Sequence, residues 1–298
     1  MFSGYALTTG TLRTRDLGFV LGTETEPADE GSPRSRVFVR HRGQWIPPVD
    51  LDWNARSCTF VTRPDERLIA ISEQGYVACL GGGEVAVEPR IAPGDQTPGP
   101  LIDVRAVATG SAYAVGTMRQ AYVRERPGGW RRIDYSCRAN GPGAADRAFC
   151  SVDGFTDTDI YAGGWEGEIW SYDGRDWSRR ETPTNLALYS VRCAGDDQVY
   201  AVGQRGLILR GRGNRWESVE HQATEEDFWA CEWFQDRLFV ATTHSLYELR
   251  GSDLLPVDFG ATRLPGTCYH LSAGDGAMWS IGALDLMQLD QDGWSRVI

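Results

Sequence analysis

The sequence predicts an all-β protein, a seven-bladed β-propeller with four antiparallel strands in each blade. A motif recurs at a spacing of about 40 residues: an apolar run ending in a small residue, a polar turn, a second apolar run and a tryptophan. Within each repeat, short runs rich in Val, Tyr, Ile, Leu and Trp alternate with Gly, Asp and Asn, as strands and turns do. No stretch shows convincing helical periodicity.

The repeats are counted from the small residue that ends the second strand of each one. This residue is Gly22, Ser72, Gly116, Gly164, Gly203, Thr242 or Gly282. The corresponding blades cover approximately residues 3–52, 53–95, 101–137, 148–184, 187–223, 227–261 and 267–298 of a single domain. Because one blade cannot bury both of its faces, the blades are expected to stack around an axis.

The tryptophan and the glycine of the repeat each have a predicted structural role. The tryptophan opens the outermost strand in five repeats, as Trp45, Trp130, Trp177, Trp216 and Trp294. A large ring there fills the gap between blades, which widens away from the axis. The glycine is expected to allow a tight turn between the second and third strands. Repeats two and six carry GEVAV and LLPV in place of the tryptophan.

The charged residues limit which kinds of catalysis and which kinds of partner are possible for this protein. The net charge is -11, and all 30 basic residues are arginine. Without lysine the chain cannot use a P-loop lysine, a Schiff-base lysine or a lysine general base. An acidic surface disfavours nucleic acid, which requires a basic footprint, and it suits a basic protein partner.

Cysteine and histidine provide no motif for catalysis or metal binding. The seven cysteines form no CxxC motif, which favours reduced thiols over a zinc site or a disulfide framework. The histidines, spread over four repeats, are His41, His221, His244 and His270. These histidines are too few and too scattered to form a metal site or to supply a Ser-His-Asp triad. We therefore expect no metal, no cofactor and no catalytic residue. The start of the chain lacks a signal peptide and no run is long enough to span a membrane, which predicts a cytoplasmic protein without membrane contact.

Three inner strands carry charged residues at equivalent heights near the predicted axis. Arg105, Asp153 and Arg192 each lie at the same distance before the small residue of their repeat. Two interpretations remain open. The residues form a structural ladder of ion pairs between blades, or they form an anion site in the central tunnel.

The remaining candidate site is a surface. In a propeller, the turns between strands two and three and the connections between blades share one face, which we call the loop face. The longest segments assigned to it are 23–35, 91–100, 138–147 and 220–227. Its acidic residues are Glu24, Glu26, Asp29, Glu30, Glu225, Glu226 and Asp227, and its short turns add Arg119, Trp165, Glu166, Arg205 and His244. We predict that this set binds a partner, because recognition is commonly built from loops on a rigid scaffold.

Trp165 in particular lies in a tight turn among charges, which is typical of a binding hot spot. The alternative is that its ring folds back over its own blade.

The repeat resembles the bacterial propeller repeats grouped around photosystem assembly factors and the sialidase-type Asp-box. The resemblance rests on Ala114 to Trp130, Ala162 to Trp177 and Ala201 to Trp216. The Asp-box pattern S-x-D-x-G-x-T-W is approximated, one residue short, by Ser171, Asp173, Gly174 and Trp177. Such boxes are structural turns, so the resemblance implies a type of repeat and transfers no activity.

These observations predict a non-catalytic propeller that binds one protein. The function favoured is a cytoplasmic immunity or neutralising protein, monomeric on its own, whose acidic loop face covers the basic cleft of a toxin such as a nuclease. An assembly or scaffolding factor, as the resemblance implies, is one alternative. A sugar-acting hydrolase or lyase is the other, with Arg105, Asp153, Tyr189 and Arg192 at the axis.

Ring closure is also open. No spare strand is evident, so either the first few residues supply one or the packing of the inner blades holds the ring shut.

Overall fold

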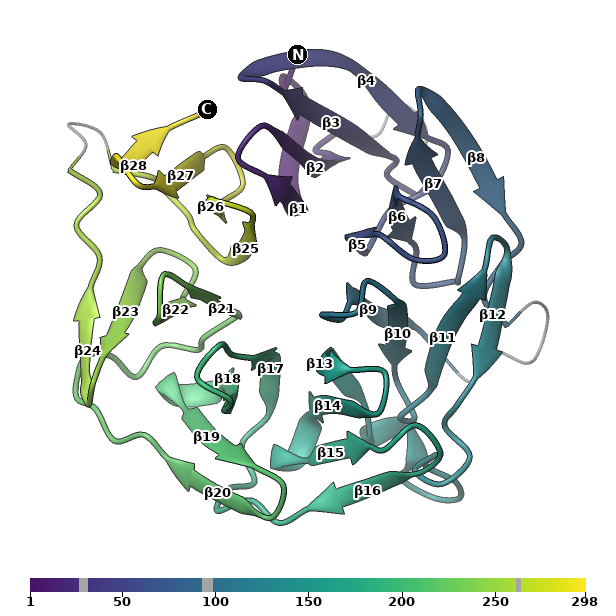
Figure 1. The fold of residues 1–298 in the computed structure, drawn as a ribbon, viewed down its shortest axis with the longest axis vertical. Coiled ribbons are helices and arrows are strands. Elements are labelled where there is room, and N and C mark those ends of the chain that lie inside the picture. Colours follow the sequence, from purple (N-terminus) through teal and green to yellow (C-terminus); the bar gives the residue numbers. More distant parts are fainter. Residues whose placement is uncertain (27–31, 93–98, 261–263) are drawn as a thin grey trace.

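Seven four-stranded antiparallel sheets surround a central axis in the computed structural model, which confirms the predicted fold (Figure 1). The structure describes residues 1–26, 32–92, 99–260 and 264–298. Each blade starts with its innermost strand and runs outward. No helix within these ranges is long and apolar enough to cross a membrane.

The strands of the first three blades follow the predicted repeats. Blade one contains β1 (Tyr5–Thr14), β2 (Leu17–Glu24), β3 (Ser35–His41) and β4 (Gln44–Leu51). Blade two contains β5 (Ser57–Val61), β6 (Arg67–Ile71), β7 (Val77–Gly81) and β8 (Glu84–Glu88). Blade three contains β9 (Leu101–Ala106), β10 (Ala112–Gly116), β11 (Ala121–Arg126) and β12 (Gly129–Arg132).

Blades four and five have short 3-10 helices on the loop face. Blade four contains β13 (Phe149–Thr156), β14 (Asp159–Gly164), η3 (Trp165–Gly167), β15 (Ile169–Tyr172) and β16 (Trp177–Arg180), and η2 (Ala144–Asp146) precedes it. Blade five contains β17 (Leu188–Cys193), β18 (Val199–Gly203), η4 (Gln204–Gly206), β19 (Ile208–Arg212) and β20 (Arg215–Ser218).

Blades six and seven complete the ring. Blade six contains β21 (Ala230–Phe234), β22 (Arg237–Ala241), β23 (Leu246–Arg250) and β24 (Asp253–Pro256). Blade seven contains β25 (His270–Gly274), β26 (Ala277–Ile281), β27 (Leu286–Asp290) and β28 (Gly293–Arg296).

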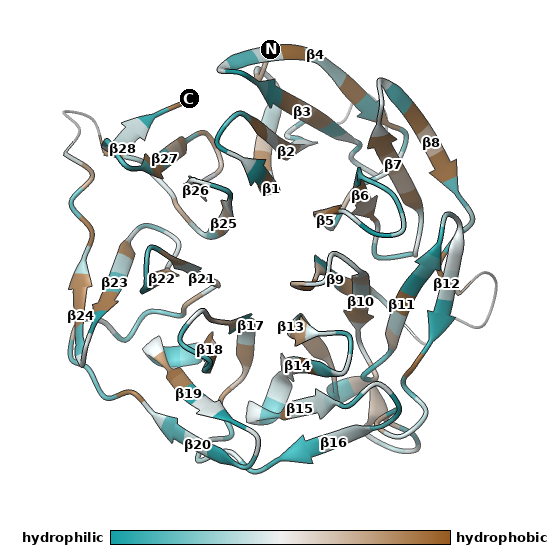
Figure 2. Ribbon diagram, in the orientation of Figure 1, coloured by the Kyte–Doolittle hydropathy of each residue, from teal (hydrophilic) through white to brown (hydrophobic). Residues whose placement is uncertain are grey.

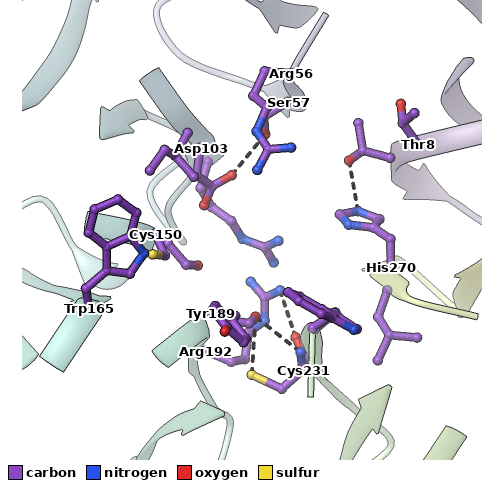
Figure 3. Close-up of a pocket in the computed structure, with 18 residues that line it drawn as sticks. Thr8, Arg56, Ser57, Asp103, Cys150, Trp165, Tyr189, Arg192, Cys231 and His270 are labelled. Atoms are coloured by element: carbon purple, nitrogen blue, oxygen red, sulfur yellow. Dashed lines mark hydrogen bonds between the residues drawn. The ribbon is translucent and has the colours of Figure 1, made fainter. Parts of the chain in front are cut away.

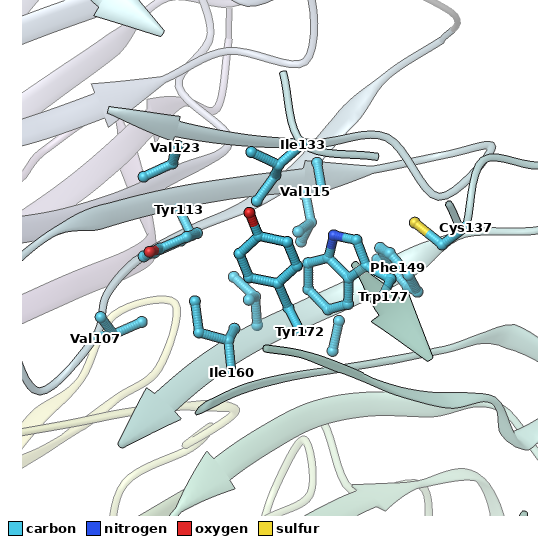
Figure 4. Packing of buried hydrophobic residues seen from close by; sticks show 13 residues of the cluster. Val107, Tyr113, Val115, Val123, Ile133, Cys137, Phe149, Ile160, Tyr172 and Trp177 are labelled. Carbon is cyan, nitrogen blue, oxygen red and sulfur yellow. The ribbon is translucent and has the colours of Figure 1, made fainter. Parts of the chain in front are cut away.

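The hydrophobic core lies between the faces of neighbouring blades, and the repeated tryptophan belongs to it. Hydrophobic residues concentrate in strands such as β7 and β10, whereas the outer strands β16 and β20 are largely hydrophilic (Figure 2). Trp177 of β16 is 3% exposed and joins a cluster with Val115 and Ile133 of blade three (Figure 4). Its ring centroid lies 5.3 Å from that of Phe149 and 5.1 Å from that of Tyr172. The tryptophan thus fills the outer gap between blades, as predicted.

The two blades without this tryptophan differ from each other. Val85 in blade two and Leu254 in blade six occupy the strand register that tryptophan occupies elsewhere. Leu254 is 6% exposed, but Val85 is 50% exposed and Val87 beyond it 74% exposed. The outer strand of blade two therefore presents apolar side chains on the rim of the ring.

The explanation predicted for the repeated glycine was wrong. Gly164 and Gly203 have extended backbones, with φ of -164° and -174°, so neither requires the freedom of glycine in the turn itself. A Cβ on Gly164 would lie 1.7 Å from the carbonyl oxygen of Ala148, and one on Gly203 would lie 1.9 Å from that of Ala187. Glycine is required because the chain entering the inner strand of the same blade passes directly against it.

The ring closes without exchange of a strand between the first and last blades. The sheet of blade seven contains only β25 to β28, so the first residues do not supply an extra strand. Instead β1 lies against β25: the N–H of Leu7 donates to the Ala283 carbonyl at 2.8 Å, and Thr14 forms a parallel bridge with Asp275. Lateral packing of the inner strands is therefore the alternative that holds.

Candidate functional site

Four charged side chains from four consecutive inner strands form a closed ring of ion pairs at the axis. Arg105 Nε lies 3.8 Å from Asp153 Oδ1, and Arg192 Nη1 lies 3.2 Å from Asp153 Oδ2. Glu232 completes the ring, with Oε1 2.9 Å from Arg192 Nε and Oε2 3.3 Å from Arg105 Nη2. We call these four residues the axial square. The structure thus brings together the three residues predicted at the axis and adds Glu232.

Glu232 was not predicted because the register of its strand, β21, differs from that of β9, β13 and β17. The four members of the square pair with the same position of their second strands, Tyr113, Tyr161, Tyr200 and Phe239. Strands β9, β13 and β17 contain a register shift before the small residue of the repeat, and β21 contains none. Glu232 is consequently one residue closer to that marker, and a fixed spacing in the sequence selects Cys231 instead.

The axial square is internally neutral, because two guanidinium groups face two carboxylates. Burial raises the pKa of Asp153 to about 6, although the positive charge of the Arg105 guanidinium has the opposite effect. Burial also raises the pKa of Glu232, again opposed by Arg105. An anion entering the tunnel would have to compete with both carboxylates for the arginines, so these contacts correspond to the ion-pair ladder.

The equivalent position in the other three blades carries a hydroxyl group. We call the seven residues the axial positions: Thr11, Thr59, Arg105, Asp153, Arg192, Glu232 and Ser272. Several of them accept a backbone N–H from the next blade. Thr59 Oγ1 accepts from Ala106 at 2.8 Å, Asp153 Oδ2 from Cys193 at 2.9 Å and Ser272 Oγ from Leu12 at 3.0 Å. These bonds join blades two and three, blades four and five, and blades seven and one close to the axis.

A cavity of about 340 Å³ lies on the loop-face side of the square, with Arg105 and Arg192 among its lining residues. Figure 3 shows the side chains that line it. Its walls include Arg56, Asp103, Trp165, Tyr189, Trp229 and His270. Trp165 is half-buried there, so its ring lines the mouth of the tunnel. His270 lies with Nε2 3.0 Å from the Gly10 carbonyl, and burial lowers its pKa.

An aromatic pair at this mouth was not predicted as a site. The rings of Tyr189 and Trp229 stack with centroids 4.6 Å apart and planes 17° apart. Trp229 is 44% exposed, and its indole N–H donates to Thr243 Oγ1 at 3.1 Å. The sequence gives little signal for Trp229, because it does not occupy a repeated position and follows the packing residue Phe228 directly.

Among the predicted residues of the short turns, Arg119 is the one the structure places in the interior. Its guanidinium pairs with buried Glu168, at 2.6 Å from Nε to Oε2 and 2.7 Å from Nη2 to Oε1. The same group lies over the ring of Trp170, 5.1 Å from its centroid, and its side chain is only 12% exposed. Little of Arg119 is available to a partner.

The other turn residues lie at the surface of the loop face. Glu166 is exposed at a left-handed φ of 58° and forms an ion pair with Arg147. Arg205 is exposed, and its N–H donates to Asp227 Oδ1 at 2.9 Å. His244 is exposed, and its Nδ1 donates to the Gly266 carbonyl at 2.9 Å.

Three of the five predicted acidic residues that the structure describes are also exposed. Glu26, Glu225 and Glu226 are exposed, whereas Glu24 is half-buried and its carboxylate accepts the N–H of Arg34 at 2.9 Å. Asp227 is half-buried beside Tyr189, whose pKa is raised by burial and by this carboxylate. Asp29 and Glu30 lie outside the described residues. Within the described ranges, no group of three or more His, Cys, Asp or Glu side chains is arranged to hold a metal ion.

The fold and the axis define a seven-bladed β-propeller closed by lateral packing, with a neutral ion-paired centre. No protein-family model matches the chain. It is 39% identical over 295 residues to the immune protein Tsi7 of Pseudomonas aeruginosa. The matched region covers 97% of this chain and 96% of Tsi7. The chain therefore belongs to the family of Tsi7.

Solved structures are similar in fold at much lower identity. YCF48 from Cyanidioschyzon merolae has a TM-score of 0.69 at 15% identity, over 97% of this chain and 96% of that one. YCF48 bound to a D1 peptide has a TM-score of 0.67 at 14% identity, over 94% of this chain and 90% of that one. The WD40 propeller domain of Doa1 has a TM-score of 0.64 at 10% identity, over 99% of this chain and 97% of that one. The predicted resemblance to photosystem assembly factors thus holds for the fold, and the Asp-box remains a prediction.

Proposed function

We propose that this protein is an immunity protein that binds a cognate toxin and neutralises it without catalysis of its own. The observation that carries the proposal is its 39% identity to the immune protein Tsi7 across 97% of the chain. The match extends over nearly the whole ring and is not confined to one or two blades.

The loop face is the surface that we assign to the toxin. Exposed Glu26, Glu225 and Glu226 lie on it, and the net charge of -11 favours a basic partner. Electrostatic complementarity of this kind speeds association and excludes partners of the wrong charge. We propose that the protein acts as a monomer in the cytoplasm, where it would intercept the toxin.

The geometry of the axis supports binding over catalysis. The charged groups that a sugar-acting enzyme would use at the axis, Arg105, Asp153 and Arg192, are already ion-paired with one another and with Glu232. A partner that covers the loop face needs no group from the tunnel.

The test begins with affinity capture of the tagged protein from its native host, and the captured partner is then expressed alone and together with this chain. We expect the partner alone to arrest growth and the chain to restore it. A variant with Glu26, Glu225 and Glu226 changed to Arg should lose the complex. Growth arrest that persists despite co-expression of the wild-type chain would contradict the proposal.

A matched control changes Glu84, Asp176 and Asp253 to Arg. These carboxylates are exposed where the turn between the third and fourth strands meets the fourth strand, at the opposite end of the blades. The change in net charge is the same, so binding should persist. An equal loss in both triple variants would show that overall charge matters and that the loop face does not.

A further inference from the structure

Trp229 is an exposed aromatic side chain at the point where the chain enters blade six. Its neighbour Phe228 is 0% exposed in the core, whereas Trp229 is 44% exposed, the highest value for any tryptophan among the described residues. Exposed tryptophans on a rigid scaffold are over-represented among the residues that dominate binding energy.

The ring of Trp229 is held in place before any partner arrives. One face stacks on Tyr189, the indole N–H is bonded to Thr243 Oγ1, and the backbone N–H donates to the Ala241 carbonyl at 2.8 Å. A partner that contacts the other face would therefore not have to order this side chain, which lowers the entropic cost of binding.

The charges around this ring favour a cation. Glu225, Glu226 and Asp227 immediately precede Phe228 and Trp229 in the chain, and none of these three carboxylates forms an ion pair with another described residue. Asp227 also lies close enough to Tyr189 to raise its pKa. The axial square beneath the mouth is neutral, so it adds no net positive charge that would repel a cation.

Elsewhere in this protein, similar rings are occupied by its own arginines. The guanidinium carbon of Arg212 lies 3.9 Å from the ring centroid of Phe155, and that of Arg90 lies 4.4 Å from that of Tyr76. No arginine in the described part of the chain covers Trp229 in this way. Indole is the aromatic group that binds cations best, and the attraction increases when water is excluded.

We propose that Trp229, Tyr189, Glu225, Glu226 and Asp227, here called the Trp229 shelf, bind an arginine or lysine side chain of the toxin. This inference rests on the proposed function and specifies the chemistry at its interface. The cation would stack on the open face of Trp229 and be neutralised by the adjacent carboxylates.

Two further exposed apolar side chains belong to loop-face segments of blades six and seven. Leu264, in the connection between β24 and β25, is 65% exposed, and Leu284, in the turn between β26 and β27, is 71% exposed. A partner that covers this face could bury them together with Trp229 and exclude water from the contact.

The test measures the affinity of the captured toxin for Trp229→Phe, Trp229→Leu and Trp229→Ala by calorimetry. We expect Trp229→Ala to weaken binding about 30-fold, as for a hot-spot residue. Trp229→Phe should retain part of the affinity because it keeps a π-face, and Trp229→Leu should lose as much as Trp229→Ala although it remains apolar. Val87→Ala, an exposed apolar side chain on the outer rim, should bind like the wild type.

The outcomes separate this inference from the proposed function. If Trp229→Leu binds as well as Trp229→Phe, the contact is merely apolar and the cation site is wrong. Binding unchanged in all three Trp229 variants removes the shelf but leaves the immunity function intact. A wild-type chain that neither binds nor neutralises the captured protein contradicts the function and, with it, the shelf.

Discussion

The axial positions of blades three to six are charged, whereas those of blades seven, one and two carry hydroxyl groups. Each group has members that accept a backbone N–H from the next blade, as Asp153 does from Cys193 and Ser272 does from Leu12. Charge is therefore not required to join neighbouring blades. It adds a contact that no hydroxyl makes here: Arg105 of blade three reaches Glu232 of blade six, 3.3 Å away. The charged half of the ring is braced across the tunnel as well as around it.

The largest effect is expected from removing one corner of the square. Glu232→Ala leaves Arg105 and Arg192 close together with only Asp153 between them. Breaking a buried ion pair from one side costs about 3–5 kcal/mol, so the free energy of unfolding in urea should fall by about that amount. If the loss is no greater than that for Ser272→Ala, the square does not act as a unit.

A smaller effect is expected from pH. The pKa of Asp153, about 6 in the folded protein, lies above its usual value of 3.8. The folded state thus holds this proton more tightly, which contributes stability below pH 4 that is lost as the pH rises through 6. Relative to Asp153→Asn, the free energy of unfolding of the wild type should fall by roughly 2 kcal/mol between those pH values. A difference that stays constant or grows with pH would contradict the raised pKa.

The smallest effect is expected in the hydroxyl half. Ser272→Ala leaves the Leu12 N–H without its side-chain acceptor, which should cost about 1 kcal/mol of unfolding free energy. Ser295→Ala, on the exposed side of β28, should cost nothing measurable. The pH dependence of Ser272→Ala should match that of the wild type, since a hydroxyl does not titrate in this range.

The sequence predicted the blades well because their signals repeat. The tryptophans and the apolar runs recur at a nearly constant period, and the structure places Trp177 in the outer gap, as expected. A periodic pattern says less about backbone detail. The close approach of the Ala148 carbonyl to Gly164 depends on how the chain enters the inner strand, which no local pattern encodes.

The candidate site at the axis was predicted only in part, because only some of its residues recur at a fixed spacing in the sequence. Arg105, Asp153 and Arg192 share a spacing, but Glu232 does not, because β21 lacks the irregularity found in the other three strands. Trp229 belongs to a single blade, and only the stacked ring of Tyr189 beside it reveals a prepared surface. Features that occur once, and contacts between distant strands, require the three-dimensional structure.

The closure of the ring without strand exchange has a mechanical consequence. Blade one and blade seven are joined through contacts such as Leu7 with Ala283 and Thr14 with Asp275, and Phe2 and Ile298 pack in the same cluster. A tensile force applied between the first and last blades acts directly on the contacts between them. The ring would split there before any blade unravelled, whereas a propeller clasped by a shared strand would transmit the same force into a full β-ladder.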